Sequence, residues 1–393
     1  MRIRALMLCV AFAMNAAIAR AQPTDEGYKL LLTAQRLRRL QRDRQRKTLR
    51  WLNFEKRVET VPDSPERGFE LALYYAVTRD EARGREAVEW AKNHLCDERQ
   101  VALVFDWCRG IITAADRARS ASCVASSGSI TALRDALFAQ TSFGTDEPKI
   151  SALPPATPDV VLNNSTQLYA LCEYLITARA LSRTDLRQDN STFFRALPNE
   201  LLLSLMPDQV DHPDWIQHIA ALALVAVDPN LEGSQFLQGW AMEDNQTLTE
   251  GPGVAYEFLW ADPYLPGVAY RNLDPWVYDP AGRLFARTSW DSDSCWLSNN
   301  FEGLRTKYCD RKQIDSVQKF GTLTLLPMNA QCVDLPKRQN RESLVLWRLN
   351  PGEAVTYRGE GKKDVSETAD PRGMWLVPEN AHDKVCRGRA GKR

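Results

Sequence analysis

The stretch Phe69–Ala91, FELALYYAVTRDEARGREAVEWA, carries the pattern that decides the fold. Its apolar residues recur three and four positions apart, as they do on one face of a helix, and do not alternate as they would in a strand. This spacing predicts consecutive helical hairpins. Their short connections place neighbouring helices antiparallel.

Helical spacing covers a large part of the chain. It runs over 28–139, is interrupted by the proline-rich stretch 146–158, which we interpret as an internal loop, and then resumes. A further helix is predicted over 213–227, with Asp211 or His212 as its cap.

The pattern changes after Tyr278, where short β-prone segments are separated by turn residues. These segments are 284–290, 294–297, 321–326, 343–347 and 354–357. A helical body followed by a small antiparallel β domain is therefore expected, which is an α+β fold.

The first residues indicate export. Arg2 and Arg4 precede an apolar run, Ala5–Ala19, and Ala19-Arg20-Ala21 has the small-x-small form of a cleavage site. We predict a signal peptide over 1–21 and a periplasmic or secreted protein. No later segment approaches the roughly 20 apolar residues of a membrane helix, so no membrane span is expected after signal removal.

Cysteine usage fits an oxidising compartment. Besides Cys9, which lies within the apolar run, the chain has an even set that could form disulfides or pack as small buried side chains: Cys96, Cys108, Cys123, Cys172, Cys295, Cys309, Cys332 and Cys386. They form no C-x-x-C pairs, so we predict no metal site, and no motif indicates a cofactor.

Charge argues against nucleic acid as a partner, because 50 basic and 50 acidic residues cancel. The basic stretch Arg36–Lys47 has leucines at helical spacing, and we interpret it as the solvated face of the first helix.

Four segments follow one another in a characteristic order: a helical hairpin, an apolar run ending in Phe-Asp-Trp, a Glu-Gly-x-Gly stretch with a tyrosine after it, and a β-prone strand. They are Leu71–Trp90, Ala102–Trp107, Glu250–Tyr256 and Phe285–Asp291. In this order they resemble the heparinase II/III-like superfamily of polysaccharide lyases, of which the chain looks like a divergent member.

The resemblance implies an incomplete α/α toroid of helical hairpins over 22–282. A small antiparallel β-sandwich-like domain would follow over 283–393 and end in a frayed basic tail from Cys386.

Two departures from the family pattern favour an alternative. Val254 stands where the family usually has its tyrosine, and Tyr256 comes two positions later. The family's His-Gly-His-x-Asp type segment has no counterpart, since 301–320 contains no histidine. The alternative is a non-catalytic member that binds glycan or protein.

Lyase chemistry at a uronate needs a group that neutralises the carboxylate, a base for the C5 proton and an acid for the leaving oxygen. Tyr256 is the first candidate base or acid, because cationic neighbours can draw a phenol toward ionisation. Arg271 and Asn272 could recognise the carboxylate, or Arg271 could form a salt bridge between the domains. Arg287 is a further candidate at a strand end.

Two histidines are candidates for proton transfer. His212 and His218 flank Trp215 on the predicted helix, and Asp214 stands four residues before His218, a spacing at which a carboxylate can orient an imidazole. Such a helix would point His and Trp toward a cleft. Alternatively, His212 merely caps the helix and His218 is a packed polar residue.

Aromatic rings concentrate between Tyr256 and Trp276, where they could stack on sugars or fill the seam between domains. The predicted binding residues are Trp215, Glu250, Trp260, Tyr264, Tyr270, Asn272 and Trp276. The expected ligand is an acidic polysaccharide or another glycan. A third hypothesis, hydrolysis by a carboxylate pair, rests on Glu232, Glu243, Asp244 and Glu250.

Overall fold

The structure is a computed structural model. It describes residues 27–113, 116, 129–144, 147–162, 164–182 and 185–273 and, beyond these, 276–278, 284–287, 289–292, 294, 296–300, 303–309, 312–313, 319–320, 323–325, 331–334, 344–348, 353–358, 363–368, 374–375 and 382–389. The predicted signal peptide, 1–21, lies outside these residues.

As far as Asn272, the regular elements of the described chain are all helices, joined by turns and loops. They are α2 (Ala34–Arg46), α3 (Leu49–Thr60), α4 (Arg67–Thr78), α5 (Glu81–Asn93), α6 (Glu98–Trp107), α8 (Ile130–Phe143), α9 (Thr157–Leu162), α10 (Ser165–Ser182), η1 (Gln188–Asn190), α11 (Ser191–Ser204), α12 (Pro207–Asp211), α13 (Trp215–Val227), α14 (Glu232–Ala241), η2 (Asp244–Gln246), α15 (Gly253–Trp260) and η3 (Tyr270–Asn272).

The hairpin predicted from Phe69–Ala91 is α4 followed by α5. Asp80 begins α5, and its carboxylate accepts hydrogen bonds from the backbone N–H groups of Ala82 and Arg83 at 2.9 and 3.3 Å. Asp97 caps α6 in the same way through Gln100 N–H, at 3.1 Å.

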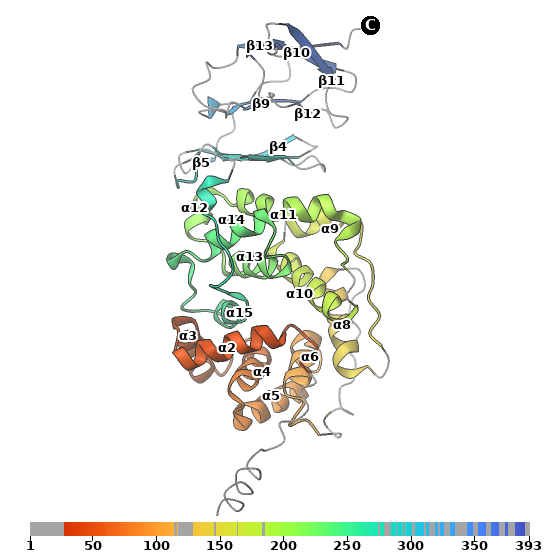
Figure 1. Ribbon diagram of the computed structural model, residues 1–393, viewed down its shortest axis with the longest axis vertical. Coiled ribbons are helices and arrows are strands. Elements are labelled where there is room, and N and C mark those ends of the chain that lie inside the picture. The colour runs from red at the N-terminus through yellow and green to blue at the C-terminus, as the bar shows by residue number, and fades with distance from the viewer. Residues whose placement is uncertain are drawn as a thin grey trace, which may run out of the picture.

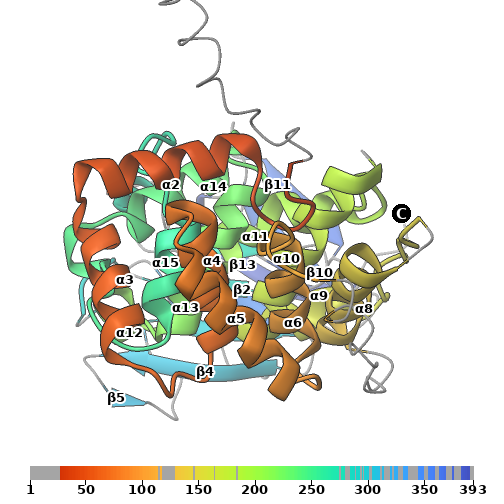
Figure 2. The same ribbon diagram turned by 90° about the horizontal axis from the view of Figure 1, so that it is seen from below.

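The helices pack side by side in the lower part of Figure 1, and the strands lie at the other end. α4 contacts α6, α6 contacts α8, α8 contacts α10, α10 contacts α13, and α13 contacts α15; α15 in turn contacts α3, which contacts α4. The view in Figure 2 shows α2 along one edge of this helical body.

The helix predicted over 213–227 begins later than expected. Asp214 takes the N-cap position and α13 starts at Trp215, while His212 ends the preceding helix α12. Pro213 explains the break, because a proline disfavours helical backbone at the residue before it. His212 therefore does not cap α13.

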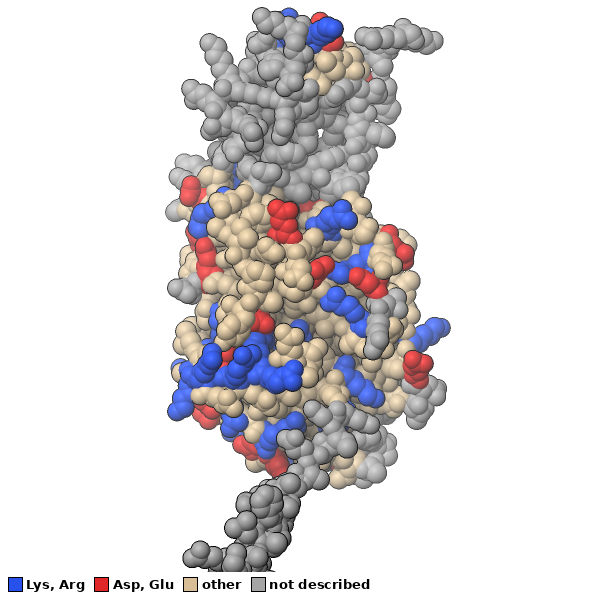
Figure 3. All heavy atoms as spheres, viewed as in Figure 1, with Lys and Arg blue, Asp and Glu red and all other residues tan. Residues whose placement is uncertain are grey.

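The basic helix α2 has two different sides. Arg39 and Leu40 are buried, whereas Arg38, Arg42 and Arg46 are exposed. Figure 3 shows lysine and arginine side chains gathered over this helix. The predicted solvated face is therefore the outer side only.

Strands follow η3, and they are short. They are β1 (Trp276–Tyr278), β2 (Leu284–Arg287), β3 (Trp296–Asn300), β4 (Gly303–Cys309), β5 (Lys312–Gln313), β6 (Lys319–Phe320), β7 (Leu323–Leu325), β8 (Cys332–Asp334), β9 (Leu344–Arg348), β10 (Glu353–Arg358), β11 (Asp364–Thr368), β12 (Met374–Trp375) and β13 (His382–Arg389).

The described strands form three sheets, with the orders β1-β2-β3-β4-β5, β11-β10-β13-β8 and β12-β9-β7-β6. The pairs within this part of the chain are antiparallel except β7 and β9, which are parallel. Residues 326–343 lie between these two strands, and a parallel pair needs a connection of about this length. The protein is thus α+β, with a helical part followed by mainly antiparallel sheets.

Both ends of the β domain differ from the prediction. The first sheet begins at Trp276 in β1, before the expected boundary at 283. β13 includes Cys386 and continues to Arg389, so no frayed tail starts at Cys386. Pairing with β10 orders this segment.

Cysteines follow both of the interpretations considered. Cys332 and Cys386 form a disulfide between β8 and β13, and Cys96 is also disulfide-bonded. Cys108 and Cys172 are free and buried in the helical part. No helix in the described part of the chain is long and apolar enough to cross a membrane.

The first sheet is joined to the end of α11. Trp296 Nε1 donates to the carbonyl oxygen of Leu203 at 2.8 Å, and Arg287 Nη2 donates to that of Leu205 at 3.3 Å. Burial lowers the pKa of Arg287 to about 10. Arg287 therefore fastens the sheet to the helical part.

The chain after α15 returns along α14, and one glycine permits this. A Cβ at Gly239 would stand 1.9 Å from the carbonyl oxygen of Val268. The backbone N–H of Val268 donates to Gln235 O at 2.9 Å, which holds the two segments together.

We expect Gly239→Ala to lower the free energy of unfolding by about 2 kcal/mol, because overpacking outweighs the roughly 1 kcal/mol that alanine gains in a helix. Urea unfolding followed by circular dichroism measures this. Gly388→Ala, where an added Cβ meets nothing within 4 Å, is the control. Equal stability of the two variants would contradict the close approach.

Candidate functional site

A cavity of about 610 Å³ lies among the N-terminal ends of several helices. It combines aromatic rings with charged groups. Its described lining residues are Glu66, Cys96, Asp97, Glu98, Arg99, Gln100, Ser129, Thr131, Ala132, Arg134, Asp135, Thr166, Tyr169, Trp215, Ile216 and Tyr256. Helices α6, α8, α10, α13 and α15 thus each contribute to its wall.

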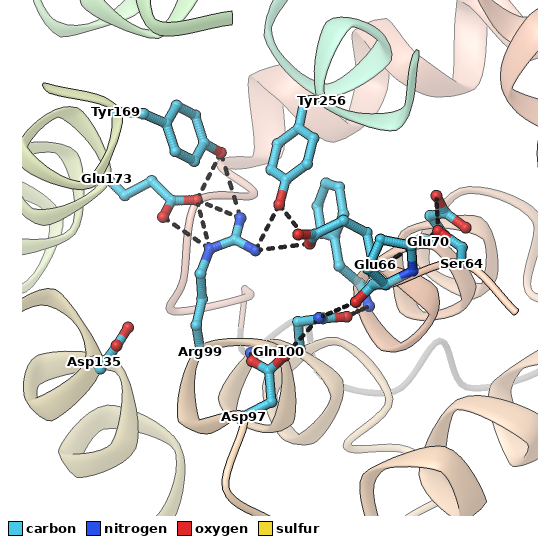
Figure 4. Close-up of polar contacts among 12 residues, drawn as sticks. Ser64, Glu66, Glu70, Asp97, Arg99, Gln100, Asp135, Tyr169, Glu173 and Tyr256 are labelled. Atoms are coloured by element: carbon cyan, nitrogen blue, oxygen red, sulfur yellow. Dashed lines mark hydrogen bonds and ion pairs between the residues drawn. The ribbon is translucent and has the colours of Figure 1, made fainter. Parts of the chain in front are cut away.

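Two arginines of the cavity wall, Arg99 and Arg134, pair with a buried carboxylate, and Figure 4 shows the contacts of Arg99. Arg99 from α6 donates from Nη2 and Nε to the carboxylate of Glu173 from α10, at 2.7 and 2.9 Å. Arg134 from α8 donates to the same carboxylate at 3.0 Å. Glu173 is fully buried, and these two guanidinium groups supply its compensating charge.

Tyr256 from α15 points to the same arginine. Its hydroxyl accepts a hydrogen bond from Arg99 Nη1 at 3.0 Å and donates one to the carboxylate of Glu66. Its ring stacks on Phe69 with 4.6 Å between centroids. The phenol is thereby held between a cation and a carboxylate.

Burial controls the protonation of these groups. It raises the pKa of Tyr256 well above its ordinary value, and the opposing effect of Arg99 is smaller. The expectation that cations draw this phenol toward ionisation is therefore wrong, because burial outweighs the effect of Arg99. Burial also raises the pKa of Glu66, against the influence of Arg99.

Glu173 behaves in the opposite way. Burial by itself would raise its pKa, but Arg99 and Arg134 more than offset burial and hold the pKa below its ordinary value. The pKa of Glu98 is raised by burial and by the neighbouring carboxylate of Asp135.

The cavity is acidic overall. Glu66, Asp97, Glu98 and Asp135 line it, whereas its two described cations, Arg99 and Arg134, both bond Glu173. No cation among the described lining residues is left to bind an anionic ligand without competing with Glu173.

Three of the predicted residues gather here. Tyr256 and Trp215 line the cavity with 6.1 Å between their ring centroids. Trp260 lies behind them and donates from Nε1 to the hydroxyl of Tyr169 at 2.9 Å. Tyr169 in turn donates to Glu173 at 2.7 Å, so Trp260 supports the buried pair.

The other predicted residues do not line the cavity. His212, Glu250 and Asn272 are exposed, and Arg271 forms an exposed ion pair with Glu243 at 3.0 Å within the helical part. Arg271 therefore does not form the salt bridge between the helical and β domains that was considered from the sequence.

Two further aromatic residues also lie elsewhere. Tyr264 is exposed beside α2, and Tyr270 packs edge-on against Trp290 at 5.1 Å. Trp276 is in β1, and its side chain lies outside the described part. The carboxylates of the hydrolase hypothesis, Glu232, Glu243 and Glu250, are not among the described lining residues either.

His218 is buried inside α13 and does not contact Asp214 through its side chain. Neither ring nitrogen has a hydrogen-bond partner among the described residues, and the ring stands edge-on to Trp240 at 6.1 Å. Burial lowers its pKa to about 4. It is a neutral, packed histidine, and the proposed orientation by Asp214 is wrong.

Sequence reasoning missed Arg99, Glu173, Arg134 and Glu66. One signal was present: Glu173 stands four residues after Tyr169, within the mostly apolar run Leu168–Ala178 of α10, all of which is buried. A carboxylate in such a helix needs a buried partner. The sequence does not say which arginine provides it.

The described residues contain no group of three or more His, Cys, Asp or Glu that could hold a metal ion. No protein-family model matches the chain, and no curated protein matches it. Membership of the heparinase II/III-like superfamily therefore stays a prediction.

We expect Glu173→Gln to lower the free energy of unfolding at pH 7 by about 3–5 kcal/mol, because Arg99 and Arg134 lose the buried carboxylate that they share and keep only the partly exposed Glu66 and Asp135 as ion-pair partners. The pKa of Glu173 is lowered in the folded protein, so its contribution is present above the ordinary pKa of a glutamate and is lost as the pH falls below it. The difference from the unmodified protein should shrink below about pH 4. Glu232→Gln, at an exposed position, is the control; a pH-independent difference would contradict the ion pair.

His218 generates a second expectation about pH. Its folded pKa of about 4 lies below the ordinary 6.5, so between these values the unfolded chain binds a proton that the folded protein does not. The free energy of unfolding should therefore fall by on the order of 3 kcal/mol as the pH is lowered from 6.5 to about 4. In His218→Leu, unfolding measured from pH 7 to 4 should lose this component. This pH-dependent component should persist in His94→Leu, which changes an exposed histidine. Loss of the component in His94→Leu would show that His218 is not its source.

Proposed function

We propose that this exported chain binds a glycan in the cavity beside Tyr256 and cleaves its glycosidic bond by acid–base chemistry. The observation that carries the proposal is the set of groups around one cavity: two aromatic rings, Trp215 and Tyr256, beside carboxylates. Aromatic faces stack on sugar rings, and carboxylates serve as acid and base.

Hydrolysis fits these carboxylates. Glu66, whose pKa burial raises, would give its proton to the glycosidic oxygen as the bond from that oxygen to the anomeric carbon breaks. Asp135, which lies on the other side of Arg99 in Figure 4, would take a proton from the water whose oxygen bonds to that carbon. One water is consumed, and both residues return to their starting protonation when they exchange a proton with solvent.

The charges favour an uncharged glycan or an amino sugar over a uronate. Four carboxylates would repel an anionic sugar, and Arg99 and Arg134 already bond Glu173. This modifies the expected ligand, an acidic polysaccharide.

Elimination at a uronate is the second candidate, and Tyr256 is the observation that favours it. A phenol that keeps its proton can protonate an alkoxide leaving group after a carboxylate has removed the C5 proton. The succession of contacts between neighbouring helices from α4 through α15 also supports a body of helical hairpins of the kind expected in this family. A member of this kind that binds without cleaving stays a third possibility.

One experiment separates these candidates. The mature protein is incubated with neutral, amino-sugar and uronate polysaccharides, and both new reducing ends and the ultraviolet absorbance of an unsaturated product are followed. We expect reducing ends without absorbance, and a loss of at least about 100-fold in rate for Glu66→Gln and Asp135→Asn, as for removal of a general acid or base.

Glu232→Gln is the control, because this exposed carboxylate is not among the described lining residues. Absorbance that Tyr256→Phe abolishes would replace hydrolysis by elimination. Binding that Trp215→Ala weakens, without either product, would establish a non-catalytic protein. Absence of binding to every polysaccharide would overturn the proposal.

A further inference from the structure

The outer side of α2 and the start of α3 form a second surface, separate from the cavity. We name it the α2 face and define it by exposed or half-buried residues of three kinds: cations, amides and large apolar side chains. They are Gln35, Arg38, Gln41, Arg42, Arg44, Gln45, Arg46, Lys47, Leu49, Leu52 and Tyr264.

The inner arginines of α2 have structural partners. Arg36 stacks over the ring of Trp260 at 4.4 Å, and Arg39 donates to the carbonyl oxygen of Leu259 at 2.6 Å. They bind α2 to the C-terminal end of α15, whereas Tyr256 one turn earlier lines the cavity. The helix therefore needs these two arginines for its packing.

Among the outer cations, Arg42 and Arg46 contact only the exposed Tyr264 within the part of the chain that the structure describes. Arg38, Arg42, Arg44 and Lys47 form no ion pair with any residue in the described ranges. Arg38, Arg42 and Arg46 stand four residues apart, so they rise along one side of the helix in steps of about 6 Å. Figure 3 shows the resulting concentration of basic side chains.

A hollow of about 400 Å³ lies beside these cations. Its described lining residues are Gln35, Arg38, Gln41, Arg42 and Gln45. They offer amide and guanidinium donors and include no carboxylate. Such a set of donors suits a phosphate group.

Apolar side chains are exposed at the end of the same helix. Leu49 and Leu52 in the first turns of α3 are 59% and 43% exposed, and Tyr264 is 57% exposed. Tyr264 is fixed in place, since Arg46 Nη1 donates to its hydroxyl at 2.8 Å and Arg42 lies over its ring at 5.5 Å. These are three of the five large exposed apolar residues in the described part.

We propose that the α2 face docks on an anionic lipid bilayer. The cations would contact lipid phosphates, Tyr264 would lie at the headgroup level, and Leu49 and Leu52 would enter the acyl boundary. A linear polyanion such as nucleic acid or an acidic polysaccharide would also contact the cations, but it would gain nothing from two exposed leucines. Cations and apolar side chains together therefore favour a lipid surface.

Vesicle flotation of the mature protein tests this. We expect it to bind phosphatidylcholine vesicles that contain phosphatidylglycerol, more weakly as salt rises, and not to bind phosphatidylcholine alone. The triple variant R38Q/R42Q/R46Q should bind on the order of 100-fold more weakly, at about fivefold for each cation near an anionic surface. Leu49→Ala with Leu52→Ala should weaken binding by about tenfold or more, because apolar surface is withdrawn from the bilayer.

The matched control is R85Q/K149Q/R195Q, which removes the same charge from exposed positions on α5, on the segment between α8 and α9, and on α11. Circular dichroism confirms folding of all variants. Binding that falls equally in both triple variants would show a general charge effect and overturn the proposal. Binding of heparin or DNA that the α2 triple variant abolishes and the leucine variant leaves intact, without vesicle binding, would overturn it in favour of a polyanionic polymer.

Discussion

The ion pair between Arg99 and Glu173 is the interaction on which the helical part depends. Burying a carboxylate without a counter-charge costs several kcal/mol, so Glu173 can be buried in α10 only if cations are brought to it. Arg99 from α6 and Arg134 from α8 supply them, and Tyr169 and Trp260 complete the hydrogen bonds. One carboxylate thereby fixes the positions of several helices.

The same pair shapes the chemistry of the cavity. Because Arg99 is committed to Glu173, it reaches Tyr256 with only one further nitrogen, and burial then keeps the phenol protonated. The remaining carboxylates face the cavity with no free cation among its described lining residues. A site that the sequence suggested would suit a uronate is thus acidic, and in the proposed function this charge favours uncharged glycans or amino sugars.

The two ends of α15 separate the two surfaces of the helical part. Tyr256 near its start lines the cavity, while Leu259 and Trp260 at its end receive the inner arginines of α2. The outer arginines are then left at the surface. One short helix therefore links the cavity on one side to the α2 face on the other.

The sequence by itself determined the succession of helices and then strands, because apolar spacing and turn residues act locally, within a few residues of each other. It also placed Tyr256 and Trp215 among the candidate site residues. It could not identify Arg99 and Glu173, which are 74 residues apart, or pair Tyr256 with Glu66 across 190 residues. His218 and Arg271 both stand in local patterns typical of site residues. In the structure, however, His218 is buried within α13, and Arg271 is exposed at the surface. Only the tertiary structure decided these points, since the partner of a buried charge is chosen by which helices pack together, and local spacing carries no information about that choice.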